Sequence, residues 1–231
     1  AGSSTTAPSL TLTGPVELVT DISITTDTGG TDGIVSFSGA VDSISGQDRT
    51  LTIDSGTAAT TISGAVGAND DLGGLTINST NTDTGAITIT GIGTGTSSGG
   101  SGSDAVTVGS TGTTLLTLAG STYNIDGTTA FEGEGAADKI KFTGSDPTIT
   151  LHNDDISFLS AGVHLDDGTL TINSQGGAIS FAGAITGSSS ESITLNSGAT
   201  GGATVTVTTI GAGNQIHAID ITGTDGVTLN G

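Results

Sequence analysis

Hydrophobic and polar residues alternate strictly along many short stretches of this chain. Aliphatic and polar side chains take turns in Leu10-Thr11-Leu12 and again in Leu51-Thr52-Ile53. A period of two, rich in β-branched residues, is typical of strands that bury one face. The pattern therefore predicts an all-β protein of many short strands. The same alternation recurs at 35–37, 75–77, 87–89, 106–108, 149–151, 170–172 and 205–207.

The chain also repeats itself. The segment Gly33–Val41 (GIVSFSGAV) returns as Gly177–Ile185 (GAISFAGAI), and a divergent third copy lies at Thr61–Val66. Each copy is followed by a second type of strand, which ends in a turn containing Asp or Asn. These second strands are Leu51–Gly56 (LTIDSG), Leu75–Ser79 (LTINS) and Ile193–Gly198 (ITLNSG), and the recurrent turn residues are Asp54, Asn78, Asn173, Asn196 and Asn230.

The spacing of the copies gives the length of the repeating unit. Leu51 and Leu75 are 24 residues apart, and Phe37 and Ile62 are 25 apart. A fixed period of this size indicates a solenoid. We predict a parallel β-helix with coils of about 24 residues, each holding two or three strands. The turn Asp and Asn residues could stack into a ladder, or each could shape its own turn.

We expect a single β-solenoid domain over residues 1–231. The Gly/Ser-rich stretch 91–104 is predicted to be a flexible loop. Residues 121–146, which contain three aromatic residues and both lysines, are predicted to form an irregular region. The two best copies lie 144 residues apart (177 minus 33), or about six coils. Two tandem β-sandwiches divided near residue 100 are the competing architecture, disfavoured by the absence of Trp and the coil-length repeat.

Composition narrows the core and the possible partners. With 40 Gly, no Trp, no Met and six aromatic residues, the core is predicted to consist of Ile, Leu, Val and Ala with an occasional Phe, and not of aromatic anchors of the usual globular kind. Abundant Gly and high charge are also typical of disorder, but the strict alternation favours an ordered fold. Three basic residues against 23 acidic ones give a net charge of -20. This charge excludes nucleic acid as a partner, disfavours anionic membranes and could attract divalent cations.

Export is expected from indirect features. The chain has no Cys, which suits a large secreted bacterial surface protein. No apolar run is long enough to span a bilayer. The chain does not begin with a signal peptide, so an export signal would have been removed or would lie in a longer parent chain.

The repeats ISGAVGANDDLGGLTINST (62–80) and FSGAV...LTIDSGT carry a resemblance. In these segments the chain resembles the β-strand-repeat regions of very large bacterial surface proteins of the filamentous-haemagglutinin and autotransporter-adhesin kind. The resemblance covers residues 33–80 and 168–200 and extends to the remainder in composition. It implies a right-handed β-helix, secretion and an adhesive or matrix role, including biofilm. It brings no catalytic residues.

Several motifs could carry chemistry. Gly99–Thr107 matches the calcium nonapeptide GGxGxDxUx, for which Gly133–Ile140 is an incomplete second copy; a plain loop is the alternative. Outward Thr-x-Thr strands could bind ice or could follow from strand preference alone. Three acidic pairs could serve a polysaccharide-cleaving β-helix as acid and base, or could solvate turns. The three His residues show no metal-ligand spacing. These residues are Asp70-Asp71, Asp154-Asp155, Asp166-Asp167, His152, His164 and His217.

We therefore predict a non-enzymatic, extracellular, structural or adhesive surface protein that assembles head to tail into a filament. No catalytic, cofactor-binding or metal-binding residue is assigned, although calcium remains an alternative. Expected partners are further copies of the chain or neighbouring repeats of a longer one, and surface carbohydrate. Pro8–Leu12 resembles Pro147–Leu151, so the N-terminal segment is predicted to act as a spare strand that adds to a neighbour's edge. The alternative is that the sequence is a fragment of a longer rod, in which case its uncapped ends mean only that the flanks are missing. A polysaccharide-active enzyme and a calcium-stabilised adhesin module are the alternatives.

Overall fold

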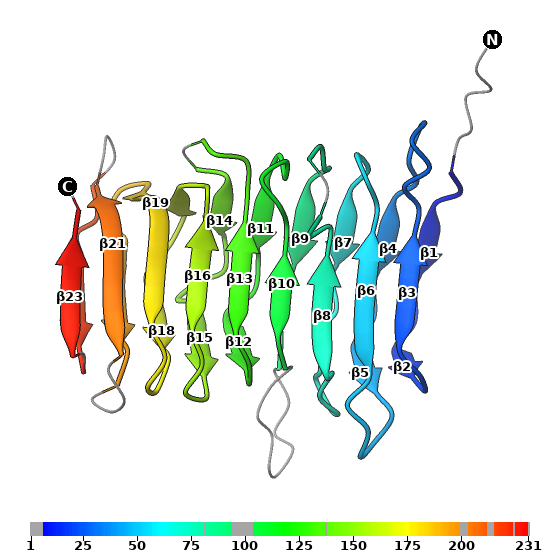
Figure 1. Cartoon of the computed structure of the whole chain (residues 1–231), viewed down its shortest axis with the longest axis horizontal. Helices are drawn as coiled ribbons and strands as arrows, with labels where there is room; N and C mark the ends of the chain where they lie inside the picture. The colour runs from blue at the N-terminus through cyan, green and yellow to red at the C-terminus, as the bar shows by residue number, and fades with distance from the viewer. Residues whose placement is uncertain are drawn as a thin grey trace.

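A computed structural model shows the chain as a β-solenoid (Figure 1). It describes residues 7–80, 82–93, 104–136, 138–198, 203–211, 215–223 and 225–230. Within these ranges there are 23 strands and no helix, and every strand pairing is parallel. The predicted parallel β-helix is confirmed.

Each coil contributes strands to three faces, which we call A, B and C in the order in which the chain meets them. Face A contains β1 (Leu10–Leu12), β4 (Val35–Phe37), β7 (Thr60–Ile62), β9 (Ile87–Ile89), β11 (Leu116–Leu118), β14 (Ile140–Phe142) and β17 (Val163–Leu165). Face B contains β2 (Val16–Leu18), β5 (Val41–Ser43), β12 (Thr122–Ile125), β15 (Thr148–Leu151), β18 (Thr169–Asn173), β20 (Ser192–Asn196) and β22 (Ala218–Thr222). Face C contains β3 (Ile22–Thr25), β6 (Thr50–Asp54), β8 (Gly74–Ile77), β10 (Val106–Val108), β13 (Thr129–Glu132), β16 (Ile156–Leu159) and β23 (Gly226–Leu229).

Two long strands join faces C and A. β19 (Ile179–Gly187) and β21 (Thr204–Ile210) each begin on face C and continue around the corner onto face A. Between β5 and β12, face B continues through isolated parallel bridges, in which Val66 pairs with Val41 and Ile92, and Ile92 pairs with Tyr123. The result is one uninterrupted stack from the N-terminal to the C-terminal end (Figure 1).

Strand register fixes the length of a coil. One column of paired residues on face A begins at Leu10 and reaches Ile210 in eight steps, so the coil averages 25 residues. The structure has about eight turns. The predicted neighbours are paired directly: Leu51 with Leu75, Phe37 with Ile62, and Leu170 with Ile193.

The two best sequence copies occupy different faces. Phe37 belongs to β4 on face A, whereas Phe181 lies in the part of β19 on face C. The copies are therefore separated by five coils and two further faces rather than by six whole coils. The divergent copy behaves as expected, because Ile62 and Val66 stack directly on Phe37 and Val41.

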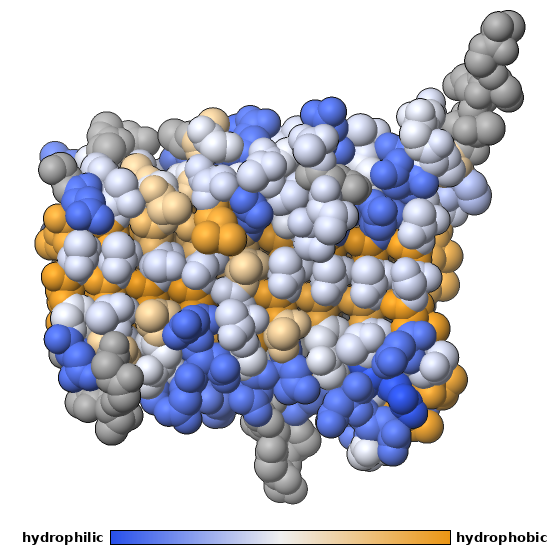
Figure 2. Space-filling view, viewed as in Figure 1, coloured by the Kyte–Doolittle hydropathy of each residue, from blue (hydrophilic) through white to orange (hydrophobic). Residues whose placement is uncertain are grey.

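The outward positions of the strands carry small hydroxyl side chains. On face C, a column of paired residues runs through nearly all coils as Ser23, Thr52, Thr76, Thr107, Ala130, Ser157, Ser180, Thr206 and Thr228. Figure 2 shows this column as a pale row along the middle of the face. Face C of the rod consequently presents a row of mostly small hydroxyl side chains.

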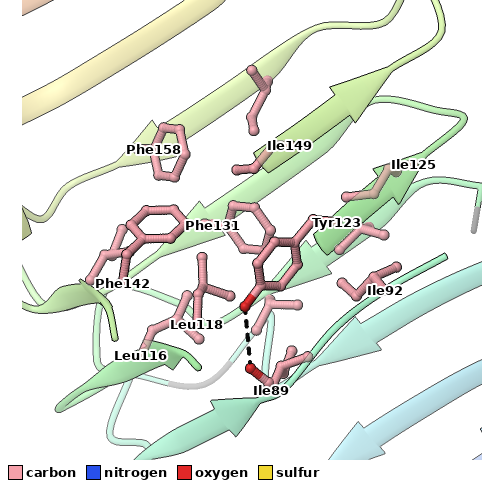
Figure 3. Close-up of a cluster of buried hydrophobic side chains, with 14 of the residues drawn as sticks. Ile89, Ile92, Leu116, Leu118, Tyr123, Ile125, Phe131, Phe142, Ile149 and Phe158 are labelled. Atoms are coloured by element: carbon pink, nitrogen blue, oxygen red, sulfur yellow. Dashed lines mark hydrogen bonds between the residues drawn. The ribbon is translucent and has the colours of Figure 1, made fainter. Parts of the chain in front are cut away.

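The core is mainly aliphatic, as expected, but aromatic residues contribute more to it than the predicted occasional Phe. Tyr123 and all five Phe residues are among the largest fully buried side chains. Phe158 stands at the centre of this group, with its ring centroid 5.7 Å from Phe131, 6.0 Å from Phe142 and 4.5 Å from Phe181. Stacked coils place rings one above another, so aromatic residues spread over the sequence form one cluster (Figure 3).

Residues 121–146 also differ from the expectation of an irregular region. They include three strands, β12, β13 and β14, and the three aromatic residues there point into the core. The Tyr123 hydroxyl accepts a hydrogen bond from the Gly120 N–H at 3.0 Å and donates to the Ile89 carbonyl at 3.4 Å (Figure 3). Burial raises the pKa of this hydroxyl. Of the predicted loop 91–104, residues 94–103 lie outside the described residues.

The turn Asp and Asn residues form two kinds of hydrogen bond, within their own turn and to a neighbouring coil. The Asp54 and Asn196 side chains each accept a hydrogen bond from the backbone N–H two residues later, in their own turns. Asn78 instead turns inward at a positive φ of 48°, and its amide oxygen accepts the Ser55 N–H of the neighbouring coil at 2.8 Å. Asn173 and Asn196 are paired in register on face B.

Candidate functional site

The C-terminal end of the rod exposes aliphatic side chains. In β22, Ile219 is 47% exposed, and in β23 Val227 and Leu229 are 46% and 63% exposed. Their counterparts inside the rod, such as Val205 and Val207, are buried by the coil that follows. These residues are exposed because no described coil lies beyond them. They form an end surface of inward-type residues with an open strand edge.

The N-terminal end is also open and apolar. A hollow of 310 Å³ lies beneath the first coil. Its lining is almost entirely aliphatic and consists of Leu10, Leu12, Val16, Glu17, Leu18, Val19, Ile22, Ile24, Phe37 and Leu51. The predicted spare strand is not a separate arm, because β1 is paired with β4 in the rod's own first coil. The feature that could accept a neighbour is therefore the outer edge of the whole first coil.

Acidic residues form a column along the corner between faces B and C. The column contains Asp48, Asp71, Asp104, Asp126 and Asp154, one from each of five successive coils. Burial first, and repulsion by the neighbouring carboxylates second, raise the pKa values of the Asp71, Asp104 and Asp154 carboxyl groups. In Figure 2, hydrophilic side chains gather along this edge, below the strands of face C.

The predicted acidic pairs do not come together in one place. Asp70-Asp71 and Asp154-Asp155 lie at the B–C corner, three coils apart, whereas Asp166-Asp167 follow β17 at the A–B corner. The Asp155 carboxylate accepts the Ala178 N–H of the next coil at 2.7 Å. Within the described ranges, no group of three or more His, Asp or Glu side chains is arranged to hold a metal ion.

The calcium nonapeptide can be placed only in part. Residues 99–103 of the first copy and Ala137 of the second lie outside the described residues. Asp104 belongs to the acidic column, but Asp138 lies at the corner between faces C and A and contacts His164. The two Asp residues of the pattern are thus at different corners of the coil.

A cluster that the sequence did not suggest surrounds His164. This side chain points outward from β17, yet it is only 9% exposed. Its Nδ1 lies 2.9 Å from the Thr186 hydroxyl and 3.5 Å from Asp138 Oδ1, while its Nε2 lies 3.1 Å from the Ser188 hydroxyl. The Thr186 hydroxyl donates to Asp138 at 2.6 Å. Three successive coils therefore meet at this one imidazole ring.

The cluster contains a Ser, a His and an Asp, but its hydrogen bonding differs from that of a nucleophile–base pair. Asp166 Oδ1 lies 3.1 Å from His164 Nε2, the nitrogen that faces Ser188. The Asp166 carboxylate therefore competes with Ser188 for this nitrogen, whereas a catalytic base would offer the nitrogen to the serine alone. The Ser189 N–H, which could otherwise stabilise an oxyanion, donates to Glu191 at 2.7 Å. The geometry fits an inter-coil clamp better than a catalytic site.

The other two His residues lie apart from this cluster. His152 Nε2 lies 3.0 Å from the Asn124 amide oxygen on face B. His217 has an exposed side chain, and its backbone N–H donates to the Glu191 carbonyl. No signal in the sequence links His164 to Asp138, Thr186 and Ser188, because the spacing depends on the lengths of two unequal corners.

A polar hollow of 640 Å³ lies at the corner between faces C and A. Thr57, Thr82 and Thr111 from three coils line it, together with the carboxylates of Asp83 and Glu134. Glu134 forms an ion pair with Lys139 at 2.5 Å.

Comparisons with known proteins leave the function to be argued from these features. No protein-family model, curated protein or solved structure matches the chain. Among the described residues, none forms a helix of the length and apolarity needed to cross a membrane.

Proposed function

We propose that this chain is a non-enzymatic structural or adhesive element of an extracellular or cell-surface assembly, extended by end-on stacking of its solenoids. The observation that carries the proposal is that the first and last described coils leave apolar residues of the inward type uncovered, around Ile22 at one end and at Leu229 at the other. A solenoid coil buries its inward residues only when a coil lies on each side. The end surfaces are therefore favourable sites for a further coil.

The shape and the sides of the rod support the same role. About eight turns at roughly 4.8 Å each give a rod about 40 Å long. Face C bears a column that is mostly Ser and Thr, which leaves a polar surface suited to many weak contacts with carbohydrate or another surface. Cys-free composition and the net charge of -20 suit a secreted protein that must stay soluble between contacts.

End-on assembly can be tested with a charge placed on the terminal coil. Leu229→Glu puts a carboxylate on the C-terminal end, where the side chain is 63% exposed in the single copy. Leu159→Glu makes the same change on the side of the rod, at a position that is 36% exposed. Both variants should give the strand-dominated circular dichroism of the wild type.

We expect the wild type and Leu159→Glu to form oligomers whose sedimentation coefficient rises with concentration, and rods longer than one copy in negative-stain micrographs. Leu229→Glu should remain a single copy. A wild type that stays monomeric at high concentration and moderate salt contradicts end-on stacking. Equal assembly of Leu229→Glu and Leu159→Glu also contradicts end-on stacking. Antibody labelling of intact source cells tests the surface location separately.

A polysaccharide-active function is the second candidate. It is favoured by the hollow at the C–A corner, where Asp83 and Glu134 supply two carboxylates, the pair that glycoside hydrolysis uses. Release of reducing sugar from a panel of acidic and neutral polysaccharides, lost in both Asp83→Asn and Glu134→Gln, would establish it. The absence of release from every substrate leaves the structural role as the better account.

A further inference from the structure

Glycines stack at the turn between faces A and B. Gly14, Gly39 and Gly64 occupy the same place in the first three coils, each two residues before the paired residues of face B. A side-chain carbon added at Gly39 would overlap the backbone of Gly14, and one added at Gly64 would overlap the backbone of Gly39. Neighbouring coils approach so closely here that only glycine fits.

These added carbons all point the same way along the rod. At Gly39, Gly64 and Gly144 the overlap is with the coil that precedes the glycine, never with the coil that follows. A carbon added at Gly14 would consequently point out of the N-terminal end. Nothing among the described residues lies within 4 Å of it. Gly14 thus leaves room at this end for another backbone to approach as closely as Gly14 itself approaches Gly39.

We propose that the first coil receives the last coil of a second copy of the chain, in the one register that continues the columns of the solenoid. This inference rests on the proposed function and specifies how the last coil of one copy meets the first coil of the next, a contact that we call the joint. The register follows from columns that begin and end on aliphatic residues, pairing Ile210 with Leu10, Ile221 with Val16, Val227 with Ile22 and Leu229 with Ile24 of the next copy. One or two apolar columns on each face are extended without interruption.

The charges at the two ends agree with this register. With Ile221 above Val16, the exposed carboxylate of Glu17 faces Thr222, which can donate a hydrogen bond to it. Asp220 faces Pro15 rather than another carboxylate. A shift by two residues would place Asp220 directly on Glu17, an arrangement of like charges that destabilises a strand pair. The end surfaces therefore favour one register over its nearest alternative.

The register is tested by cross-linking, since the chain contains no Cys. Ser23 and Thr228 point outward on face C, and the proposed joint makes them direct neighbours. Their Cα atoms would be about 4.8 Å apart, within the roughly 4.4–6.8 Å that a disulfide requires. The test variant is Ser23→Cys/Thr228→Cys, and the matched control is Thr11→Cys/Thr228→Cys, whose first cysteine lies on face A.

After mild oxidation at equal concentration, we expect a ladder of covalent multimers from the test variant on a non-reducing gel. Its cross-linked fraction should be several-fold higher than that of the control. Filaments in micrographs without this difference overturn the register but leave the proposed function intact. A result with no filaments and no cross-links overturns both the register and the proposed function.

Gly14→Ala gives an independent measurement. Because the added methyl points into open space in the single copy, this variant should melt like the wild type and yet lose end-on association. Gly64→Ala, with its methyl directed at the backbone of Gly39, should instead lower the melting temperature of the monomer. Association of Gly14→Ala that equals the wild type contradicts the proposed close contact.

Discussion

The aromatic cluster makes a quantitative test of how this narrow core is stabilised. Phe158 is fully buried on face C and has ring neighbours above, below and across the interior, at Phe131, Phe181 and Phe142. The Phe158→Ala variant removes the ring on which these three contacts converge. Phe37→Ala provides the matched control, because Phe37 is equally buried on face A and has no ring contact with this cluster.

The expected loss follows from the contacts. Truncation of a buried Phe to Ala costs about 3–5 kcal/mol of unfolding free energy. Each aromatic pair adds about 0.5–1.5 kcal/mol beyond burial. The centroid distances of 4.5, 5.7 and 6.0 Å to Phe181, Phe131 and Phe142 place all three partners within the range of such pairs. We therefore expect Phe158→Ala to be less stable than Phe37→Ala by about 1.5–4.5 kcal/mol.

Thermal unfolding followed by far-ultraviolet circular dichroism measures this difference. For a domain of this size, 1 kcal/mol corresponds to about 2–4 °C in the melting temperature. The gap between the two variants should be several degrees, and urea midpoints should rank them in the same order. Equal losses in Phe158→Ala and Phe37→Ala would show that the stacked rings contribute only buried area.

Two further predictions concern polar groups. His164→Ala removes the ring that joins Asp138, Thr186 and Ser188 across three coils. We expect this variant to lower the free energy of unfolding by about 1–3 kcal/mol. His217→Ala is the control, because the His217 side chain is exposed and its loss should change the free energy of unfolding little. Burial first, and the Asp48 carboxylate second, raise the pKa of the Asp104 carboxyl in the folded protein above its ordinary value of 3.8. The unfolded chain therefore loses this proton at a lower pH than the folded protein does. As the pH rises above 3.8, the charged Asp104 destabilises the fold. Asp104→Asn should therefore stabilise the protein near neutral pH and lose this advantage in acid, as followed by urea denaturation at both pH values. Asp83→Asn, which removes one charge at another corner, controls for net charge, and an Asp104→Asn gain that persists in acid would contradict the linkage.

Strand alternation and local repeats were enough to predict the fold class and several stacked neighbours. Leu51 and Leu75, for example, are paired as their spacing implies. Position along the rod was harder to predict because the corners vary in length. The step from Leu75 to Val106 takes 31 residues, whereas the step from Val163 to Ile185 takes 22. A single period cannot describe such a chain.

Contacts that depend on those corners could not be predicted from the sequence. His164, Asp138 and Ser188 meet because a short coil follows β17 and brings β19 beneath it. The aromatic cluster has a similar origin: the register places Phe131, Phe158 and Phe181 at the same position of successive strands. Only the paired positions, and not the composition, reveal that five of the six aromatic residues meet in one cluster.

The displaced copy at Gly177–Ile185 shows that a repeated segment in a solenoid indicates similar local structure. It does not by itself indicate a whole number of coils. In both copies a strand with two inward apolar residues runs into a glycine-containing corner and then onto the next face. The strands on faces A and C share a pattern of inward apolar and outward polar residues. A segment that fits the A–B corner can therefore also fit the C–A corner. The 144 residues between the copies equal five and two-thirds coils of about 25 residues, which is why they resemble six whole coils of 24. Faces that are chemically interchangeable permit a repeat to move from one to another, whereas the columns at the two ends must match face by face for a second copy to add. The end-on register is therefore the more demanding test of how this chain encodes its structure.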